Sequence, residues 1–115
     1  MKKLYTSYFA KYKGSNAVAI SQGIPEGFKG SWLKGLAPDW KLVKAYKQGQ
    51  ITFQQLADAY IRDLDERGIE MDVLVNMFEE GTVFLCWEKS GTPCHRHILA
   101  ELMNRTGLVT VTELE

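Results

Sequence analysis

The chain has 115 residues, of which 45% are hydrophobic and 24% are charged, and its formal net charge is zero. This composition is typical of a folded globular domain and excludes a disordered or collagen-like chain. No apolar run reaches the length that spans a bilayer, and the basic start MKKLYTSYFAKYKG lacks the apolar core of a signal peptide. We therefore expect one domain over residues 1–115, with a cytoplasmic location and no membrane partner.

The first half of the chain predicts two strands, a long loop and a helix. Residues 3–10 (KLYTSYFA) and 16–21 (NAVAIS) have the β-branched, aromatic and apolar content of strands. Residues 22–38 contain four glycines and two prolines, which predicts a long irregular loop of the kind that often carries function. Asp39 is a candidate cap for a helix that ends at Gly49.

Two further helices are expected in the middle of the chain. Thr52 and Gln55 form a capping-box pattern, and apolar residues at helical spacing continue from there to a stop at Gly68. A shorter apolar pattern predicts another helix from about Met71 to Glu80.

The last third predicts a strand, a helix and a final strand. Residues 82–87 (TVFLCW) are apolar on both faces, which is typical of a central strand covered by helices on each side. Pro93 suits the first turn of a helix that runs to about Arg105, and residues 108–114 (LVTVTEL) favour a strand. This loose alternation predicts the α/β class: a single three-layer domain with a small, mostly parallel sheet flanked by helices.

Charge is divided unevenly along the chain. Residues 1–50 carry nine lysines against two acidic side chains, a balance of +7, and residues 51–115 carry a balance of −7. Eight of the thirteen aromatic residues also lie in the basic half. Lysines interleaved with aromatic rings suit a phosphorylated small molecule or a nucleic-acid backbone as a partner. The alternative is that most of these rings belong to the core.

All cysteines and histidines of the chain fall within Cys86–His97. An apolar strand ends in Leu85-Cys86 and is followed by Trp87 and Glu88, and a short glycine-containing loop then leads to Cys94–His97 and to Leu99–Glu101. With the segments YTSYFA, AISQGIPEGFKG, LAPDWKLVKAYKQGQIT and YIRDL, this pattern resembles the short branch of the DUF488 family over nearly the whole chain. The resemblance implies a small α/β protein and carries no assigned activity.

The Cys-His-Arg segment predicts an anion-binding pocket. Cys86 should lie at the carboxyl end of the central strand, where open parallel sheets bind ligands, with Cys94, His95 and Arg96 in the first turn of the next helix. Helix N-termini favour anions, and the forked side chain of Arg96 suits phosphate or carboxylate. The same surroundings would lower the pKa of the Cys94 thiol.

Other residues are expected near the same edge of the sheet. Ser7, Ser21 and Gln22 follow or end the first two strands, and the carboxyl ends of parallel strands open on one side. Lys29, in the glycine-rich loop, is a candidate phosphate ligand if that loop closes over the site.

Three functional alternatives remain open for this segment. A cysteine-dependent enzyme acting on a phosphorylated or sulfur-carrying substrate would use Cys94 or Cys86 as nucleophile, His95 for proton transfer and Arg96 to stabilise charge. A nucleic-acid-associated binding module would use Arg96 and the lysines. A non-catalytic scaffold would bury the cysteines and hold Arg96 against an acidic neighbour such as Glu101.

Metal and redox roles are the remaining alternatives. No cofactor is predicted, because the spacing fits none of the familiar zinc patterns; zinc at Cys86, Cys94 and His97 is a minority alternative. Cys86 and Cys94 would form a redox-active dithiol if the loop between them folds back. A structural disulfide is not expected in the cytoplasm. The sequence predicts no oligomeric state.

Overall fold

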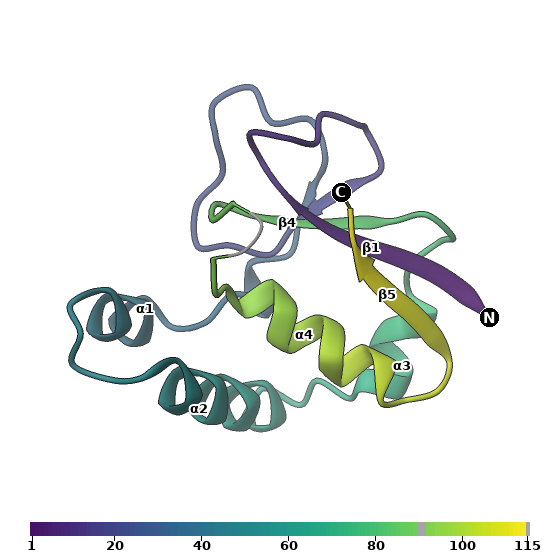
Figure 1. The fold of residues 1–115 in the computed structure, drawn as a ribbon. Coiled ribbons are helices and arrows are strands. Elements are labelled where there is room, and N and C mark those ends of the chain that lie inside the picture. Colours follow the sequence, from purple (N-terminus) through teal and green to yellow (C-terminus); the bar gives the residue numbers. More distant parts are fainter. Residues whose placement is uncertain (90–91, 115) are drawn as a thin grey trace.

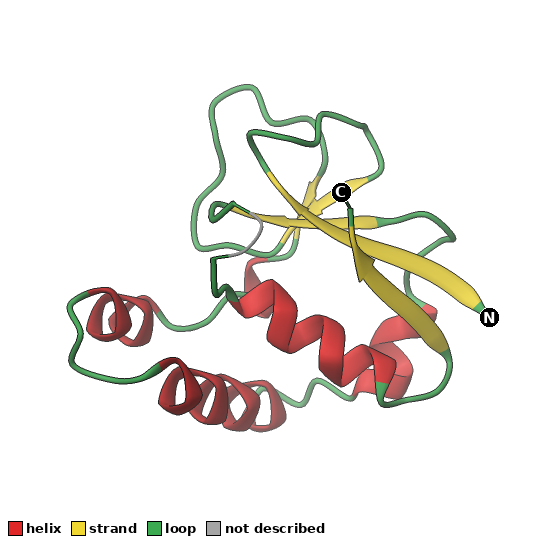
Figure 2. Ribbon diagram, viewed as in Figure 1, coloured by secondary structure: helices red, strands yellow, loops and turns green. Residues whose placement is uncertain are grey.

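A five-stranded sheet in which every strand pair is parallel forms the centre of the fold (Figures 1 and 2). The computed structural model describes residues 1–89 and 92–114; Ser90 and Gly91, within the predicted loop 88–92, lie outside the described residues. The strand order is β3-β2-β4-β1-β5. The strands are β1 (Lys2–Tyr8), β2 (Ala17–Ala19), β3 (Ser31–Trp32), β4 (Val83–Cys86) and β5 (Val109–Glu113). The predicted α/β class is confirmed.

The described part of the chain also forms four α-helices and a 3₁₀ turn. These are the 3₁₀ turn Lys34–Leu36, α1 (Trp40–Lys47), α2 (Phe53–Glu66), α3 (Met71–Asn76) and α4 (His95–Asn104). The predicted starts of α1 and α2 are confirmed: Asp39 accepts a hydrogen bond from the Lys41 amide, and the Thr52–Gln55 capping box is complete. Gly49 and Gly68 follow these two helices with positive φ angles, as stop positions require.

Three elements differ from the sequence expectation. β3 lies inside the predicted loop and is only two residues long, too short for an alternating pattern to reveal. α3 ends at Asn76 instead of Glu80, because the chain turns there and Lys2 Nζ bonds the carbonyls of Val75 (3.0 Å) and Phe78 (2.5 Å). α4 begins at His95, because Cys94 is extended (φ −148°) and serves as the N-cap.

The two faces of the sheet are covered differently. One face packs against α2, α3 and α4 through a large apolar cluster that includes Leu4, Phe84, Tyr60 and Leu99. The other face carries a smaller cluster around Leu85, covered by side chains of loop segments. Figures 1 and 2 show the helices gathered below the sheet and loops above it. Helical cover was expected on both sides of β4, so this detail of the three-layer prediction is wrong for one face.

The parallel arrangement brings three strand ends to one edge, as predicted. Tyr8 at the end of β1 is in register with Cys86 at the end of β4, and Ala19 at the end of β2 is in register with Leu85. The N-terminus of α4 meets the same edge. Within the described residues, no helix has the length and apolar character needed to cross a membrane.

Candidate functional site

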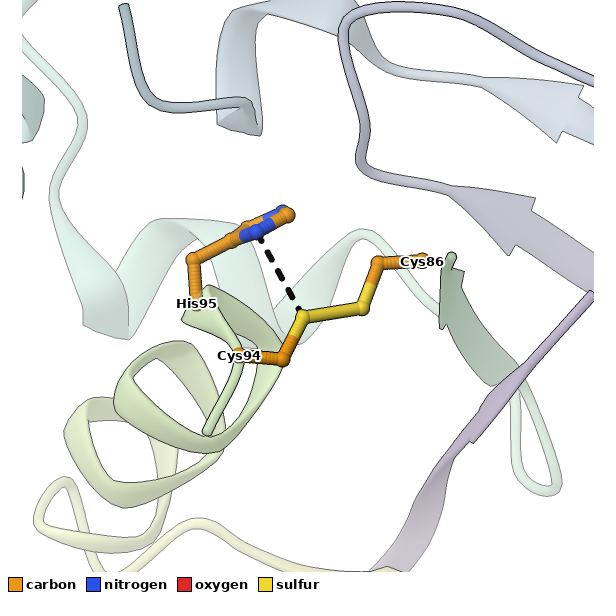
Figure 3. Close-up of side chains that lie close together, drawn as sticks. All are labelled: Cys86, Cys94 and His95. Atoms are coloured by element: carbon orange, nitrogen blue, oxygen red, sulfur yellow. Dashed lines mark hydrogen bonds between the residues drawn. A yellow bond between two sulfur atoms is a disulfide. The ribbon is translucent and has the colours of Figure 1, made fainter. Parts of the chain in front are cut away.

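Cys86 and Cys94 meet at the carboxyl edge of the sheet and are joined by a disulfide (Figure 3). Cys86 ends β4, and Cys94 caps the helix that follows, so the intervening connection returns the chain to the strand it has just left. Both side chains are nearly inaccessible, with exposed fractions of 1% and 4%. This is the pairing that the sequence left open for a redox-active dithiol, which requires the connection between the two cysteines to fold back.

A cavity of about 280 Å³ opens beside this disulfide. Its walls come from the loop after β2, from α1 and α2, and from both ends of the 86–95 segment. The lining is Ser21, Gln22, Gly23, Pro38, Trp40, Val43, Tyr46, Lys47, Leu56, Cys86, Trp87, Glu88, Thr92, Pro93, Cys94 and His95. Seven of these sixteen residues have aromatic or aliphatic side chains, and the two cysteines add further apolar surface. The cavity therefore suits a small ligand with substantial apolar surface.

His95 presents an unprotonated ring nitrogen to Cys94. Its Nε2 lies 2.5 Å from the carbonyl oxygen of Ile20, and because a carbonyl only accepts, Nε2 carries the hydrogen. Burial lowers the pKa of His95 to about 4, so the ring is neutral near pH 7 and Nδ1 has a free lone pair. Nδ1 lies 3.7 Å from Cys94 Sγ, the contact drawn in Figure 3.

The ring of His95 is also fixed in orientation. Its edge meets Tyr60 with ring centroids 5.7 Å apart, and the Tyr60 hydroxyl donates a 2.5 Å hydrogen bond to the Leu36 carbonyl. Burial raises the pKa of Tyr60, so this hydroxyl keeps its proton. A buried, neutral and oriented imidazole can accept a hydrogen bond at Nδ1 from a reduced Cys94 thiol, although a pKa of about 4 makes it a weak base.

Arg96, which is completely buried, contacts the sulfur of Cys86. Its Nη1 donates to Cys86 Sγ at 2.9 Å and to the Glu88 carbonyl at 2.6 Å. Its Nε and Nη2 form a two-pronged pair with the Glu113 carboxylate at 3.0 and 2.7 Å. The acidic neighbour suggested from the sequence, Glu101, pairs with Arg105 instead. The fork of Arg96 therefore already holds a carboxylate of its own chain.

The remaining residues predicted for the site are distributed over three places. Ser21 and Gln22 line the cavity, where the Gln22 side-chain amide donates to the Pro38 carbonyl at 2.7 Å. Ser7 is in register with Leu85 and so points to the opposite face of the sheet from Cys86. Lys29 lines a separate hollow with Phe9, Tyr12 and Phe28. The structure thus brings Ser21 and Gln22 to the cysteines and leaves Ser7 and Lys29 elsewhere.

The side chains able to hold a metal differ from the predicted set. Cys86, Cys94 and His95 place their ligand atoms within 4.8 Å of one another, whereas His97 lines a different hollow, with Thr6 and Glu113. His95 thus occupies the position expected for His97. Two of the three donors are the bonded sulfurs, so these residues would offer thiolates to an ion only after reduction of the disulfide.

Sequence reasoning missed two parts of the site. α1 and α2 supply Trp40, Val43, Tyr46, Lys47 and Leu56 to the cavity wall. The sequence signal that could have revealed this wall is the apolar side of α1, which includes Trp40 at the start of the helix. The structure buries none of the α1 residues and leaves Trp40 59% exposed. The partner of Arg96, Glu113, carried no local signal because seventeen positions separate the two residues.

The fold and the site define a small parallel α/β protein with a cysteine pair beside an apolar cavity at the carboxyl edge of its sheet. Residues 10–107 match DUF488-N3a, described as the active DUF488-N3 subclade, and the chain belongs to the DUF488 family. Neither curated proteins nor solved structures give a significant match to the chain. The family name denotes a domain of unknown function, so an activity has to be argued from the site itself.

Proposed function

We propose that the protein is a cysteine-dependent enzyme that catalyses thiol–disulfide exchange on a sulfur-carrying small molecule. The observation that carries the proposal is the disulfide between Cys86 and Cys94 in the wall of the 280 Å³ cavity. Both cysteines line this ligand-sized space, although only 1% and 4% of the two residues are exposed. Each sulfur also has its own chemical partner, His95 for Cys94 and Arg96 for Cys86.

The predicted location favours an active pair over a structural one. The sequence predicts cytoplasmic residence, where disulfides are rare and those that occur are mostly transient and either catalytic or redox-sensing. Cys86 and Cys94 are only eight positions apart, and both line a ligand-sized space. A cysteine pair with these properties is better explained by turnover between dithiol and disulfide than by stabilisation of the fold.

In the proposed reaction, Cys94 attacks the substrate and Cys86 resolves the mixed disulfide. In the reduced protein, His95 Nδ1 accepts a hydrogen bond from the Cys94 thiol, the thiol loses its proton to solvent, and the resulting thiolate at the α4 N-terminus attacks a substrate disulfide. One half of the substrate leaves as a thiolate that takes a proton from solvent, and a mixed disulfide remains on Cys94. Cys86 then attacks the Cys94 sulfur, the second substrate thiol leaves, and the Cys86–Cys94 bond forms.

The reverse half-reaction restores the dithiol. A low-molecular-weight thiol, as thiolate, attacks Cys94, and Cys86 leaves as a thiolate that accepts the 2.9 Å hydrogen bond from Arg96. A second molecule of the thiol releases Cys94 and departs as the symmetrical disulfide. In total, one substrate disulfide becomes two thiols while two reductant thiols become one disulfide, and two electrons pass through the cysteine pair.

An anion pocket at Arg96 remains a prediction of the sequence and has less support from the geometry. Four of the five guanidinium N–H groups donate to Glu113, Cys86 and the Glu88 carbonyl. A phosphate at Arg96 would have to displace the Glu113 carboxylate. Stabilisation of a Cys86 thiolate requires no such displacement, which is why we place Arg96 in the exchange reaction.

The test uses the two single-cysteine variants, each of which is the matched control for the other. Reduced Cys86→Ser and Cys94→Ser proteins are incubated with 2-hydroxyethyl disulfide and followed by mass spectrometry. We expect Cys86→Ser to accumulate a mixed disulfide on Cys94, because the resolving thiol is missing. Cys94→Ser should react no faster than N-acetylcysteine.

The wild-type protein should oxidise to the internal disulfide in the same experiment. The proposal fails if Cys86→Ser also reacts no faster than N-acetylcysteine, or if the wild-type protein never converts to the internally bonded form. Circular dichroism of both variants excludes unfolding as the cause of a negative result.

A further inference from the structure

We infer that the cavity selects small, neutral disulfides that carry a planar apolar group, and discriminates against charged ones such as glutathione disulfide. The inference rests on the proposed exchange activity and deepens it by naming the substrate class. Three properties of the cavity carry it: its limited access, its lack of unpaired charge and its aromatic rim.

Access to the sulfurs excludes large substrates. Cys94 is 4% exposed and Cys86 1%, so the disulfide of a folded protein cannot approach either sulfur closely. The cavity volume of about 280 Å³ also lies at the lower end of the range for small-molecule pockets. The substrate must therefore be a low-molecular-weight compound of which one part enters the cavity.

Charge in the cavity wall is internally compensated. Among the described lining residues, Lys47 is the one lysine or arginine and Glu88 the one carboxylate, and they pair at 3.3 Å. His95, at the floor, is neutral. A substrate carboxylate or ammonium placed here would lose its hydration without gaining a free partner, which is costly. A neutral group gives up much less hydration free energy on entering the cavity.

The exposed aromatic side chains at the cavity favour a ligand with a planar group. Trp40 and Trp87 line the cavity and are 59% and 51% exposed, an unusual amount of aromatic surface to leave in water. Trp87 is held in place by a 3.1 Å hydrogen bond to the Gly23 carbonyl and by edge contact with Phe9 at 4.8 Å. A planar group stacked on either indole would cover apolar surface that is otherwise left in water.

The experiment measures how fast the reduced protein reacts with three disulfides. The probes are 4,4′-dithiodipyridine (neutral and planar), 2-hydroxyethyl disulfide (neutral and aliphatic) and glutathione disulfide (charged). Each rate is divided by the rate of N-acetylcysteine with the same probe, which removes the intrinsic reactivity of the disulfide. We expect the ratio for 4,4′-dithiodipyridine to exceed the other two by at least about tenfold.

Two variants locate the selectivity in the cavity. Trp40→Ala should reduce the advantage of the planar probe over 2-hydroxyethyl disulfide to a few-fold. Leu108→Ala, which removes an exposed apolar side chain outside the lining, is the control and should keep that advantage. Glu88→Gln frees Lys47 and keeps the backbone carbonyl that Arg96 binds. It should raise the ratio for the planar dianion 5,5′-dithiobis(2-nitrobenzoate) several-fold.

The outcomes separate the inference from the function on which it rests. If the wild-type protein exceeds N-acetylcysteine by one common factor with all three probes, or prefers glutathione disulfide, the exchange activity stands and the inferred substrate class is wrong. If it exceeds N-acetylcysteine with none of them, the proposed function itself fails. An unchanged preference in both variants would also overturn the assignment to this cavity.

Discussion

Arg96 Nη1 donates a 2.9 Å hydrogen bond to the sulfur of Cys86 at the end of β4. The same guanidinium donates two hydrogen bonds to the Glu113 carboxylate at the end of β5. Arg96 itself lies in the first turn of α4. One fully buried cation thus connects two strand ends and a helix start. The same residue therefore holds the framework of the fold together and contacts the cysteine pair on which the proposed exchange depends.

Replacement of Arg96 by methionine should lower the free energy of unfolding strongly. The change removes the guanidinium from its ion pair with the partly buried Glu113 carboxylate, which keeps a 2.6 Å hydrogen bond from Thr6 Oγ1. Loss of one member of a buried ion pair costs about 3 kcal/mol or more. Urea denaturation with the disulfide intact measures the effect. Arg105→Met is the matched control, because it breaks the exposed pair with Glu101 and should cost less than about 0.5 kcal/mol. Equal losses in the two variants would contradict the structural role of Arg96.

Reduction of the Cys86–Cys94 bond should lower the free energy of unfolding by about 2–3 kcal/mol. The bond closes a short loop, with the two cysteines eight positions apart, and the chain-entropy relation gives this range for a loop of that length. Urea denaturation with and without a phosphine reductant measures the difference. The double variant Cys86→Ser, Cys94→Ser should be insensitive to the reductant. A titration that finds two free thiols in the protein purified without reductant would show that the bond had not formed.

The protein should lose stability between pH 6.5 and pH 4 because of His95. Burial lowers the pKa of this residue to about 4 in the folded chain, against about 6.5 when unfolded. Below pH 6.5 the unfolded chain therefore binds a proton that the folded chain does not accept until about pH 4. The free energy of unfolding should fall across this window by about 3 kcal/mol in total, and His95 should have no effect above it.

Substitution His95→Gln tests this origin, because glutamine does not titrate and can still donate to the Ile20 carbonyl. The slope of stability against pH should become shallower in the window. Glu88, which raises the pKa of His95, and Arg96 and His97, which lower it, are kept in this variant. His97→Gln is the control: burial also lowers the pKa of that half-buried ring, and its removal should change the slope less. An unchanged slope in His95→Gln would refute the assignment.

A nucleic-acid partner remains a prediction from the lysine-rich half of the chain. Some of these lysines bind carbonyls of the fold, including Lys2 to Phe78 and Lys11 to Leu114, and α1 presents exposed Lys41 and Lys44 to solvent. If α1 forms the contact, Lys41→Gln with Lys44→Gln should weaken retention on heparin at low salt. Glu79→Gln with Glu80→Gln, in the acidic half, is the control. No retention of the wild-type protein at low salt would remove this prediction.

Local signals account for most of the fold that was predicted. The caps at Asp39 and Thr52 and the stops at Gly49 and Gly68 act within one helical turn, so the sequence reveals them directly. β4 was readable from its unbroken apolar run. The two-residue β3 was not, because it exists only through pairing with β2, a contact that no local pattern records.

The same distinction explains the candidate site. The Cys-His-Arg segment was located because its unusual residue types cluster in the sequence. The partners that define its chemistry are the Ile20 carbonyl for His95 and Glu113 for Arg96, which come from distant positions. The role of the α1 apolar side as a cavity wall was not predicted, for the same reason. Its residues face a cavity only because the loop after β2 and the disulfide stand opposite them.

The disulfide also closes a small ring of chain whose members Trp87, Glu88, Thr92 and Pro93 line the cavity. Occupancy of the cavity and the oxidation state of the cysteines are therefore thermodynamically linked. Any compound that binds the oxidised cavity more tightly than the reduced one must make the disulfide harder to reduce by the same factor, and a compound with the opposite preference must make it easier. The reduction potential of the cysteine pair should therefore change when a ligand occupies the cavity.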